Sequence, residues 1–150
     1  TRAYPLPEES GHPAAGQGYL KRKKDDTKKK VLLCVNAALE KKAKDITILN
    51  MQKVTSFTDY AIICSGNSDR QVQSIAQAIE EHMKKNGFLP LGIEGEKTAR
   101  WILMDYADII VHVFYEPVRD FYDIERLWSD APRMEVENDT DRVTRLRKGM

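Results

Sequence analysis

The chain has 150 residues, with 24 Lys and Arg against 23 Asp and Glu, a formal net charge of +1 and 41% hydrophobic residues. That length suits one domain with a single core, and no run approaches the roughly 18–20 apolar residues that a membrane span requires. The first residues lack the apolar run of a signal peptide, and Glu8 and Glu9 are untypical of a transit peptide. We therefore expect a cytoplasmic protein.

Charge is distributed unevenly along the chain. Residues 1–30 carry a net charge of +4, residues 31–132 carry −4, and residues 133–150 carry +1. Residues 1–28 contain Pro and Gly and few aliphatic side chains, so we expect a flexible basic tail. Its cations within Lys21–Lys30 suit contact with the phosphates of a nucleic acid. The alternative is a solvated tail that keeps the protein soluble.

The globular part, residues 29–132, begins with a helical pattern. Apolar side chains recur at helical spacing over Lys29–Lys44, and lysines close the last turn, where the helix dipole favours cations. The short β-branched run Ile46–Leu49 predicts a strand. The continuous apolar run Tyr60–Cys64 is typical of a central strand that is buried on both faces.

A second helix follows this central strand. Ser68 takes the N-cap position with Gln71 as its capping-box partner, and Asn86-Gly87 gives a signal for the helix end. Phe88–Ile93 predicts a strand whose proline favours an edge position or a bulge. Because the helix between the two strands is a crossover of suitable length, we expect them to be parallel or nearly so.

The last part of the chain predicts a hairpin, a helix and a tail. Trp101–Met104 and Ile109–Tyr115 are strand-like, and the four residues between them are too few for a crossover, so the pair is antiparallel. Pro117 opens a helix that reaches Trp128. Residues 133–150 are expected to be a charged tail that frays or forms a loosely held helix. The chain thus predicts an α+β fold with a mixed sheet of about five strands and helices packed on it.

No catalytic motif is complete in this sequence. The turn Ser65–Ser68 lies between a strand and a helix, where backbone N–H groups bind anions, but no acidic pair that could hold metal ions follows it. His112 lies alone in a strand, and Cys34 and Cys64 lie in apolar runs typical of buried thiols in a reducing compartment. We therefore expect no catalytic residue, no metal ion and no cofactor. The alternative is a nucleotidyltransferase-like enzyme that binds a nucleotide or phosphate at the Ser65–Ser68 turn.

Aromatic residues concentrate near the predicted hairpin. Within 28 residues the chain has seven of them: Trp101, Tyr106, Phe114, Tyr115, Phe121, Tyr122 and Trp128. Core packing accounts for part of this set. Trp and Tyr are also enriched in the hot spots of protein interfaces, where one buried anchor contributes ~2 kcal/mol or more. The segment is therefore a candidate partner-binding surface.

Six short motifs occur in a fixed order between residues 30 and 131. They are Ser56–Tyr60, Ser65–Gln71, Glu94-Gly95, Trp101–Tyr106, Val111–Phe114 and Arg119–Trp128. In order and spacing they resemble the Iojap-related ribosomal silencing factors. Ala107 replaces the glycine expected in the turn and Ile124 replaces the usual leucine, and neither change removes a polar group.

The resemblance implies a non-enzymatic translation repressor. Members of that family bind the large ribosomal subunit through its protein number fourteen, which sterically blocks joining of the small subunit when nutrients are short. Their fold resembles that of nucleotidyltransferases without the catalytic acidic pair. Dimers are known for the isolated proteins, so the resemblance includes a homodimer of the free chain. Ribosomal RNA is the nucleic acid that the basic tail would then contact.

The resemblance also carries partner-binding residues over to this sequence. They are Glu94, Gly95, Trp101, Leu103, Asp105, Tyr106, His112 and Phe114. We expect apolar contact from Trp101 and Leu103, and ion pairs of Glu94 and Asp105 with basic side chains of the ribosomal protein. An acidic globular part facing a basic partner would speed encounter and suppress wrong partners.

Overall fold

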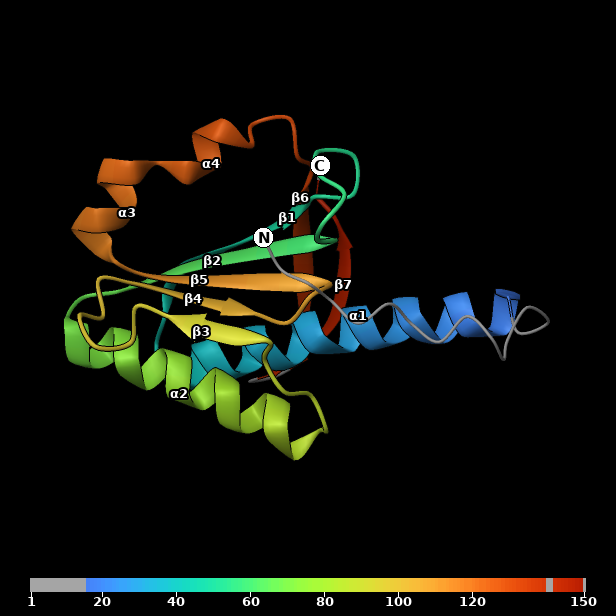
Figure 1. The fold of residues 1–150 in the computed structure, drawn as a ribbon, viewed down its shortest axis with the longest axis horizontal. Coiled ribbons are helices and arrows are strands. Elements are labelled where there is room, and N and C mark those ends of the chain that lie inside the picture. Colours follow the sequence, from blue (N-terminus) through green and yellow to red (C-terminus); the bar gives the residue numbers. More distant parts are fainter. Residues whose placement is uncertain (1–15, 140–141, 150) are drawn as a thin grey trace.

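A mixed sheet forms the centre of the molecule (Figure 1). The computed structural model describes residues 16–139 and 142–149. Within these residues the elements, in chain order, are α1 (Gly16–Glu40), β1 (Lys44–Asn50), β2 (Tyr60–Gly66), α2 (Asp69–Lys85), β3 (Gly92–Glu94), β4 (Trp101–Asp105), β5 (Ile109–Tyr115), α3 (Glu116–Tyr122), α4 (Ile124–Leu127), β6 (Arg133–Asp139) and β7 (Arg142–Lys148). The predicted α+β class is confirmed.

The described strands form one sheet of seven in the order β3-β4-β5-β2-β1-β6-β7, two more than expected. Strands β2 and β5 pair in parallel, and the other neighbours pair antiparallel. The strand after α2 runs in the same direction as β2, as expected, but the two are not a neighbouring pair, because β4 and β5 lie between them. The two most apolar runs, β2 and β5, instead take the centre, while the short β3 pairs with β4 at the edge that its neighbouring proline predicted.

Helices cover the two faces of the sheet differently (Figure 1). Helices α1 and α2 lie along one face and α3 and α4 cross the other. The larger core cluster lies under α1 and α2 and joins inward residues of α1, α2 and the strands, among them Val35, Ile75, Ile62 and Val111. Within the described residues no helix is long and apolar enough to cross a membrane.

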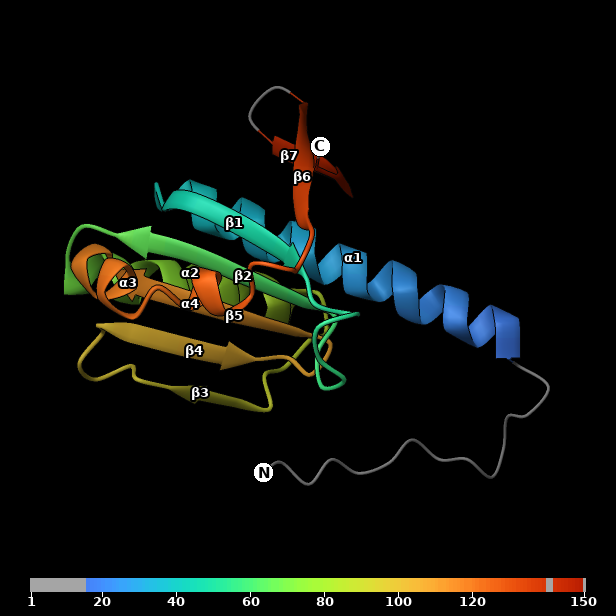
Figure 2. The same ribbon diagram turned by 90° about the horizontal axis from the view of Figure 1, so that it is seen from above.

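The first helix is longer than predicted. It begins at Gly16 instead of Lys29 and ends at Glu40, and in Figure 2 its first half projects beyond the sheet. Lys and Arg are good helix formers, and Thr27 in this half is buried with 3% of its surface exposed, so the segment is ordered by contact with the body. The predicted tail therefore overlaps the helix, and residues 1–15 lie outside the described residues.

The C-terminal segment is a hairpin and not a frayed tail or helix. Strand β6 pairs with β7 over its length and with β1 at two positions, Ile48↔Met134 and Leu49↔Arg133. Half-buried Met134, Val136 and Leu146 pack against the larger core cluster. In β6 the apolar residues Met134 and Val136 alternate with polar ones, which is the pattern of a strand with one buried face.

The remaining local predictions are mostly confirmed. Strands β4 and β5 form the expected antiparallel hairpin. Ser68 caps α2 and accepts a hydrogen bond from the Gln71 backbone N–H at 3.1 Å, while the Gln71 side chain accepts from the N–H of Asn67 at 2.6 Å. Both cysteines are buried, and burial raises the pKa of the Cys64 thiol to about 12. The predicted last helix is broken, because Asp123 has left-handed backbone angles between α3 and α4.

Candidate functional site

The sheet face opposite α1 and α2 has aromatic and polar side chains in register. Across the β4–β5 hairpin Trp101 lies opposite Phe114, Leu103 opposite His112 and Asp105 opposite Ile110. Directly opposed residues of antiparallel strands point to the same side of the sheet. Glu94 of β3 lies opposite Leu103 in turn, so six of the eight predicted partner-binding residues share this face.

Five aromatic rings join this face to the helices above it. The Trp101 and Phe114 rings stack with centroids 4.8 Å apart, and the Tyr122 ring lies 5.2 Å from Trp101. The indole Nε1–H of Trp101 donates to Nδ1 of His112 at 3.1 Å, and the His112 ring lies 5.7 Å from that of Trp128. Burial lowers the pKa of His112 to about 4, so at neutral pH the ring is uncharged and its Nδ1 can accept this bond.

A buried arginine fixes α3 and α4 to the strands. The Arg119 guanidinium donates to Ser65 Oγ of β2 at 2.9 Å, to Thr47 Oγ1 of β1 at 3.2 Å, and to both carboxylate oxygens of Glu125 at 2.8 and 3.2 Å. Hydrogen bonding to Arg119 is the main cause that holds the pKa of Glu125 below its usual range. The left-handed Asp123 between them turns α4 back so that Glu125 reaches the arginine. The hydrogen bonds of Arg119 to the strands and to Glu125 therefore fix the orientation of both short helices.

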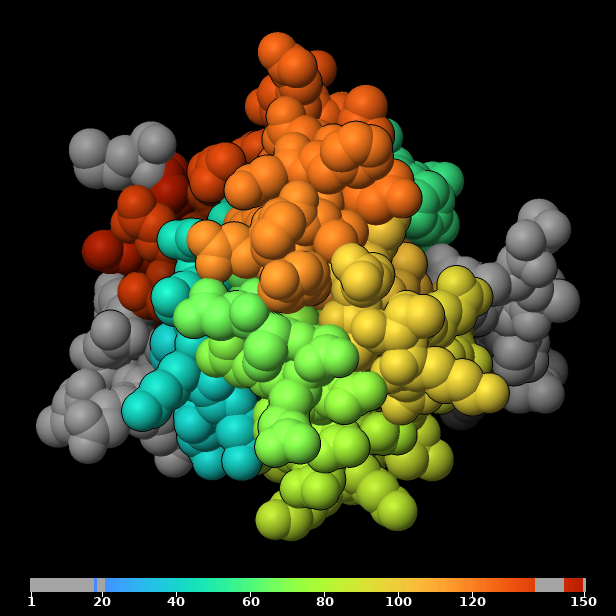
Figure 3. Space-filling view, turned by 90° about the vertical axis from the view of Figure 1, so that its left-hand side faces the viewer, coloured from blue at the N-terminus to red at the C-terminus, as the bar shows by residue number. Residues whose placement is uncertain are grey.

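Large apolar side chains on the outer side of α3 and α4 remain open to solvent. Phe121 is 79% exposed, Leu127 76% and Tyr122 53%. Figure 3 shows this segment in orange as a ridge beside the yellow residues of the β3–β4 connection. Half-buried Trp101 and Leu103 lie on the sheet face that these helices cross. Together the five residues are the aromatic surface of the molecule, an arrangement suited to protein binding.

The structure separates the predicted site residues into two groups. Glu94 and Gly95 are exposed and Trp101 and Leu103 are half-buried. Asp105, Tyr106, His112 and Phe114 are buried, with 6%, 3%, 5% and 0% of their surfaces exposed. The Asp105 carboxylate accepts from the N–H of Ala107 at 2.9 Å and so braces the hairpin turn, while Tyr106 belongs to the core under α1 and α2. In this conformation the four buried residues cannot contact a partner directly, and they stabilise the strands that carry the exposed ones.

The sequence prediction missed three residues of the surface. Phe121, Tyr122 and Leu127 were outside the predicted partner-binding set, although the aromatic pair was expected near the hairpin. An unbroken helix over this segment would have turned some of these side chains inward. The signal that could have found them is the charged pair Arg119 and Glu125, six positions apart, which cannot meet on a regular helix.

The Ser65–Ser68 turn, considered above as a nucleotide or phosphate site, forms hydrogen bonds within the protein. The Ser65 hydroxyl accepts from Arg119, and the Ser68 hydroxyl caps α2. A hollow of about 290 Å³ beside it is lined in part by Ser68, Thr98 and Arg100. Within the described residues no group of three or more His, Cys, Asp or Glu side chains could hold a metal ion.

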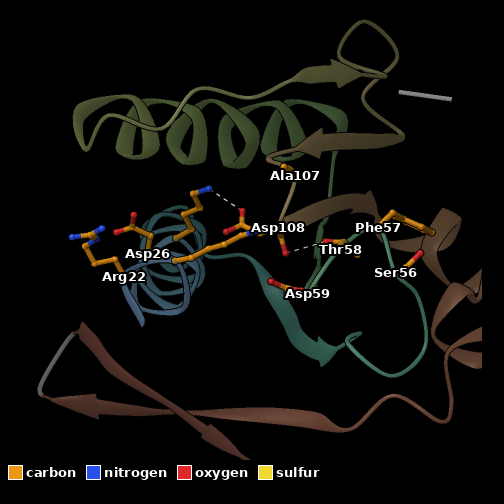
Figure 4. A pocket seen from close by; sticks show the side chains of 10 residues that line it. Arg22, Asp26, Ser56, Phe57, Thr58, Asp59, Ala107 and Asp108 are labelled. Atoms are coloured by element: carbon orange, nitrogen blue, oxygen red, sulfur yellow. Dashed lines mark hydrogen bonds and ion pairs between the residues drawn. The ribbon is translucent and has the colours of Figure 1, made fainter. Parts of the chain in front are cut away.

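A larger hollow, of about 660 Å³, lies at the other end of the sheet between α1 and the loop before β2 (Figure 4). Its lining holds three cations and three carboxylates: Arg22, Lys23, Lys30, Asp26, Asp59 and Asp108. Lys30 Nζ pairs with Asp108 at 2.8 Å. Burial and the neighbouring Asp108 charge raise the pKa of Asp59. Because these charges balance one another, the hollow has no excess charge for an ionic ligand.

Known proteins share this sequence and fold. Residues 24–149 match the family described as ribosomal silencing factor during starvation. The chain is 42% identical over 105 residues to the ribosomal silencing factor RsfS of Halalkalibacterium halodurans, covering 70% of this chain and 90% of that protein. It is 42% identical over 110 residues to RsfS of Bacillus subtilis, covering 73% and 93%. A crystal structure of a Chromobacterium violaceum protein has a TM-score of 0.66 and 38% identity, covering 67% of this chain and 84% of that one.

Proposed function

Because this chain belongs to the ribosomal silencing factor family, we propose that it represses translation by occupying the large ribosomal subunit. It binds there through the subunit's protein number fourteen and leaves no room for the small subunit. The action needs no catalysis, since a bound protein blocks association by its volume alone. The proposal includes a cytoplasmic location. The relatives named as ribosomal silencing factors support the family function.

The aromatic surface is the observation that carries this proposal. Phe121, Tyr122 and Leu127 are each more than half exposed, beside half-buried Trp101 and Leu103. Clustered aromatic and apolar anchors of this kind supply most of the binding energy of an interface, at about 2 kcal/mol or more for each hot-spot residue. Arg119 and the Trp101–His112 hydrogen bond hold these anchors in place before binding, which reduces the entropy lost on association.

Acidic side chains around the aromatic surface suit a basic partner. Four acids, Glu94, Glu96, Asp120 and Asp123, are exposed near its edges against three cations, Lys97, Arg100 and Arg126, and residues 31–132 carry a net charge of −4. Ribosomal proteins are generally basic, so opposite charges would raise the association rate and disfavour acidic competitors. In this proposal Glu94 forms the ion pair expected of it, and the buried Asp105 acts through the hairpin turn.

The predicted homodimer belongs to the same proposal. A second copy that covers the aromatic surface would hide Phe121 and Leu127 from water in the free protein. Because one surface cannot hold two partners at once, the dimer would have to dissociate before it binds the subunit. Sedimentation at rising protein concentration tests this, and Phe121→Ser should shift the protein toward the monomer.

Co-sedimentation with purified large subunits tests the main proposal. The wild-type chain should pellet with the subunits and reduce their association with small subunits, measured by light scattering. Leu127→Ser should lower the affinity at least tenfold. Leu39→Ser is the matched control, because Leu39 is 42% exposed on α1, on the other face of the sheet. A wild-type chain that stays in the supernatant, or equal losses for both variants, would contradict the proposal.

A further inference from the structure

The first half of α1 concentrates positive charge. Residues 16–30 contain seven Lys and Arg and two Asp, a net charge of +5, whereas residues 31–132 carry −4. Residues 21–26 and 28–29 are exposed. This half of the helix projects beyond the sheet (Figure 2). The molecule therefore has a cationic arm on an otherwise acidic body.

Asp108 holds this arm in a fixed direction. Thr27 Oγ1 donates a hydrogen bond to one carboxylate oxygen of Asp108. Lys30 Nζ pairs with the other oxygen at 2.8 Å, the dashed contact to Asp108 in Figure 4. Thr27 and Lys30 thus define the side of the helix that faces the sheet. The arm is anchored through its inner side, and its outer side is left to solvent.

Helical periodicity arranges the outer cations in two rows. Lys21, Lys24 and Lys28 fall on one row, and Lys29 falls on a neighbouring one with Arg22, which is exposed but also lines the rim of the larger hollow. At 1.5 Å per residue each row is about 10 Å long. Five cations with two intervening carboxylates, those of Asp25 and Asp26, leave a surface with a net positive charge and regular spacing.

We infer that this outer surface binds the phosphate backbone of RNA, which on the proposed function is ribosomal RNA beside the protein contact. The segment Lys21–Lys30 contains no apolar residue. An amphipathic helix that lies on a membrane needs an apolar face, and a protein interface needs buried anchors. Rows of lysines without such anchors suit a regularly charged polyanion, whose released counterions supply the binding free energy.

The arm and the aromatic surface are independent of each other. Helix α1 lies on one face of the sheet and α3 and α4 on the other (Figure 1). A ligand on the arm therefore leaves Phe121 and Leu127 accessible. This separation allows the RNA contact and the protein contact to be removed one at a time.

The test measures the full chain binding to a fluorescent RNA duplex over a series of KCl concentrations. With three to five phosphates neutralised, the logarithm of the affinity should fall with the logarithm of salt with a slope of about −2 to −4. Replacing Lys21, Lys24 and Lys28 by Gln should make this slope shallower by about 2 and weaken binding at least tenfold at 50 mM salt. Glutamine has a helix propensity close to that of lysine, so the fold should be kept.

The matched control replaces Lys53, Lys84 and Lys85 by Gln. These lysines are exposed on other parts of the surface, and their replacement changes the net charge by the same amount. It should leave the slope unchanged. An equal loss in both triple variants, or tighter binding to anionic lipid vesicles than to RNA, would overturn the inference. The arm variant should still bind the isolated large-subunit protein, and Leu127→Ser should still bind RNA. Failure of the protein contact alone would refute the proposed function, and failure of the RNA contact alone would refute this inference.

Discussion

The two faces of the sheet differ in what covers them and in what their side chains do. Under α1 and α2, strand residues such as Ile62, Met104 and Val111 form a continuous apolar core. Under α3 and α4, the smaller cluster around Ile63 and Phe114 shares its face with a histidine, and the helices above it are tied down by Arg119. The first face is closed by 25-residue and 17-residue helices, and the second by helices of seven and four residues.

This difference separates stability from recognition. Two long helices can bury the first face completely, so its residues contribute mainly through apolar burial. Two short helices cannot hide both of their own sides, so Phe121 and Leu127 stay exposed. Helices this short are not stable by themselves, and polar bonds to the strands replace the missing apolar contact. The covered face therefore sets the fold, and the partly covered face presents the proposed binding surface.

Neighbouring isoleucines on opposite faces offer the largest test of this comparison. Ile62 and Ile63 are both fully buried in β2, and Ile62 faces α1 and α2 while Ile63 faces α4. Either substitution by Ala should lower the free energy of unfolding by about 2–5 kcal/mol, because it leaves a cavity. Ile62→Ala should keep its affinity per folded molecule, whereas Ile63→Ala should also weaken subunit binding. Urea unfolding and co-sedimentation of the same samples measure both. Equal affinities of the two variants would remove the distinction between the faces.

Breaking the arginine contact should have the next largest effect. Arg119→Met removes hydrogen bonds to Ser65, Thr47 and Glu125, and we expect a loss of about 2–3 kcal/mol. The loss should be local, so amide exchange in residues 116–127 should accelerate more than exchange in α2. Glu125→Gln keeps an acceptor for the guanidinium and should cost less. Uniform acceleration over both segments would show that Arg119 stabilises the whole fold and not the binding surface.

The buried histidine predicts a loss of stability in mild acid. Burial lowers the pKa of His112 to about 4, below the ordinary value of about 6.5. Between these values the unfolded chain binds a proton that the folded protein does not, so stability is complete above pH 6.5 and falls as the pH drops toward 4. From pH 7.5 to 5 the loss should be about 2 kcal/mol.

Urea unfolding of wild type and His112→Gln over that range isolates this effect. The Gln variant keeps an acceptor for the Trp101 N–H and removes the titration, so its stability should change less with pH. The lowered pKa of Glu125 stabilises the fold at neutral pH, and this contribution is lost only below about pH 5, because the carboxyl is charged in both states above that pH. Parallel pH profiles for the two proteins would contradict the buried, neutral state of His112.

Local signals made the centre of the fold predictable from the sequence. The runs Tyr60–Cys64 and Ile109–Tyr115 are strongly apolar, and each became a central strand. The Ser68 cap depends only on adjacent residues and was also found. The partners of β2 and β3 were not, because pairing depends on which strands bury most surface, a property of the whole sheet. The start of α1 was missed because lysine-rich sequence is compatible with both helix and tail until Thr27 meets Asp108.

The candidate site was predictable as a region but not residue by residue. The motifs placed Trp101 and Leu103 correctly on the partly covered face. They could not reveal that Phe114 and Tyr106 are buried on opposite sides of the sheet, because burial depends on where α1 and α3 pack. The break between α3 and α4 at Asp123 could not be predicted either, because it also depends on tertiary contacts. A left-handed residue outside glycine is costly, and it is kept here by the Arg119–Glu125 pair on either side of it.

Exposed residues of the binding surface should show the smallest change in stability. Phe121 is 79% exposed, so Phe121→Ser should alter the free energy of unfolding by no more than about 0.5 kcal/mol. Its affinity for the large subunit should nevertheless fall at least tenfold, because the ring would be buried only in the complex. This is the reverse of Ile62→Ala, which loses stability and keeps affinity. If Phe121→Ser binds as tightly as wild type while Leu127→Ser does not, the contact is confined to α4, and α3 serves only to bring the chain to it.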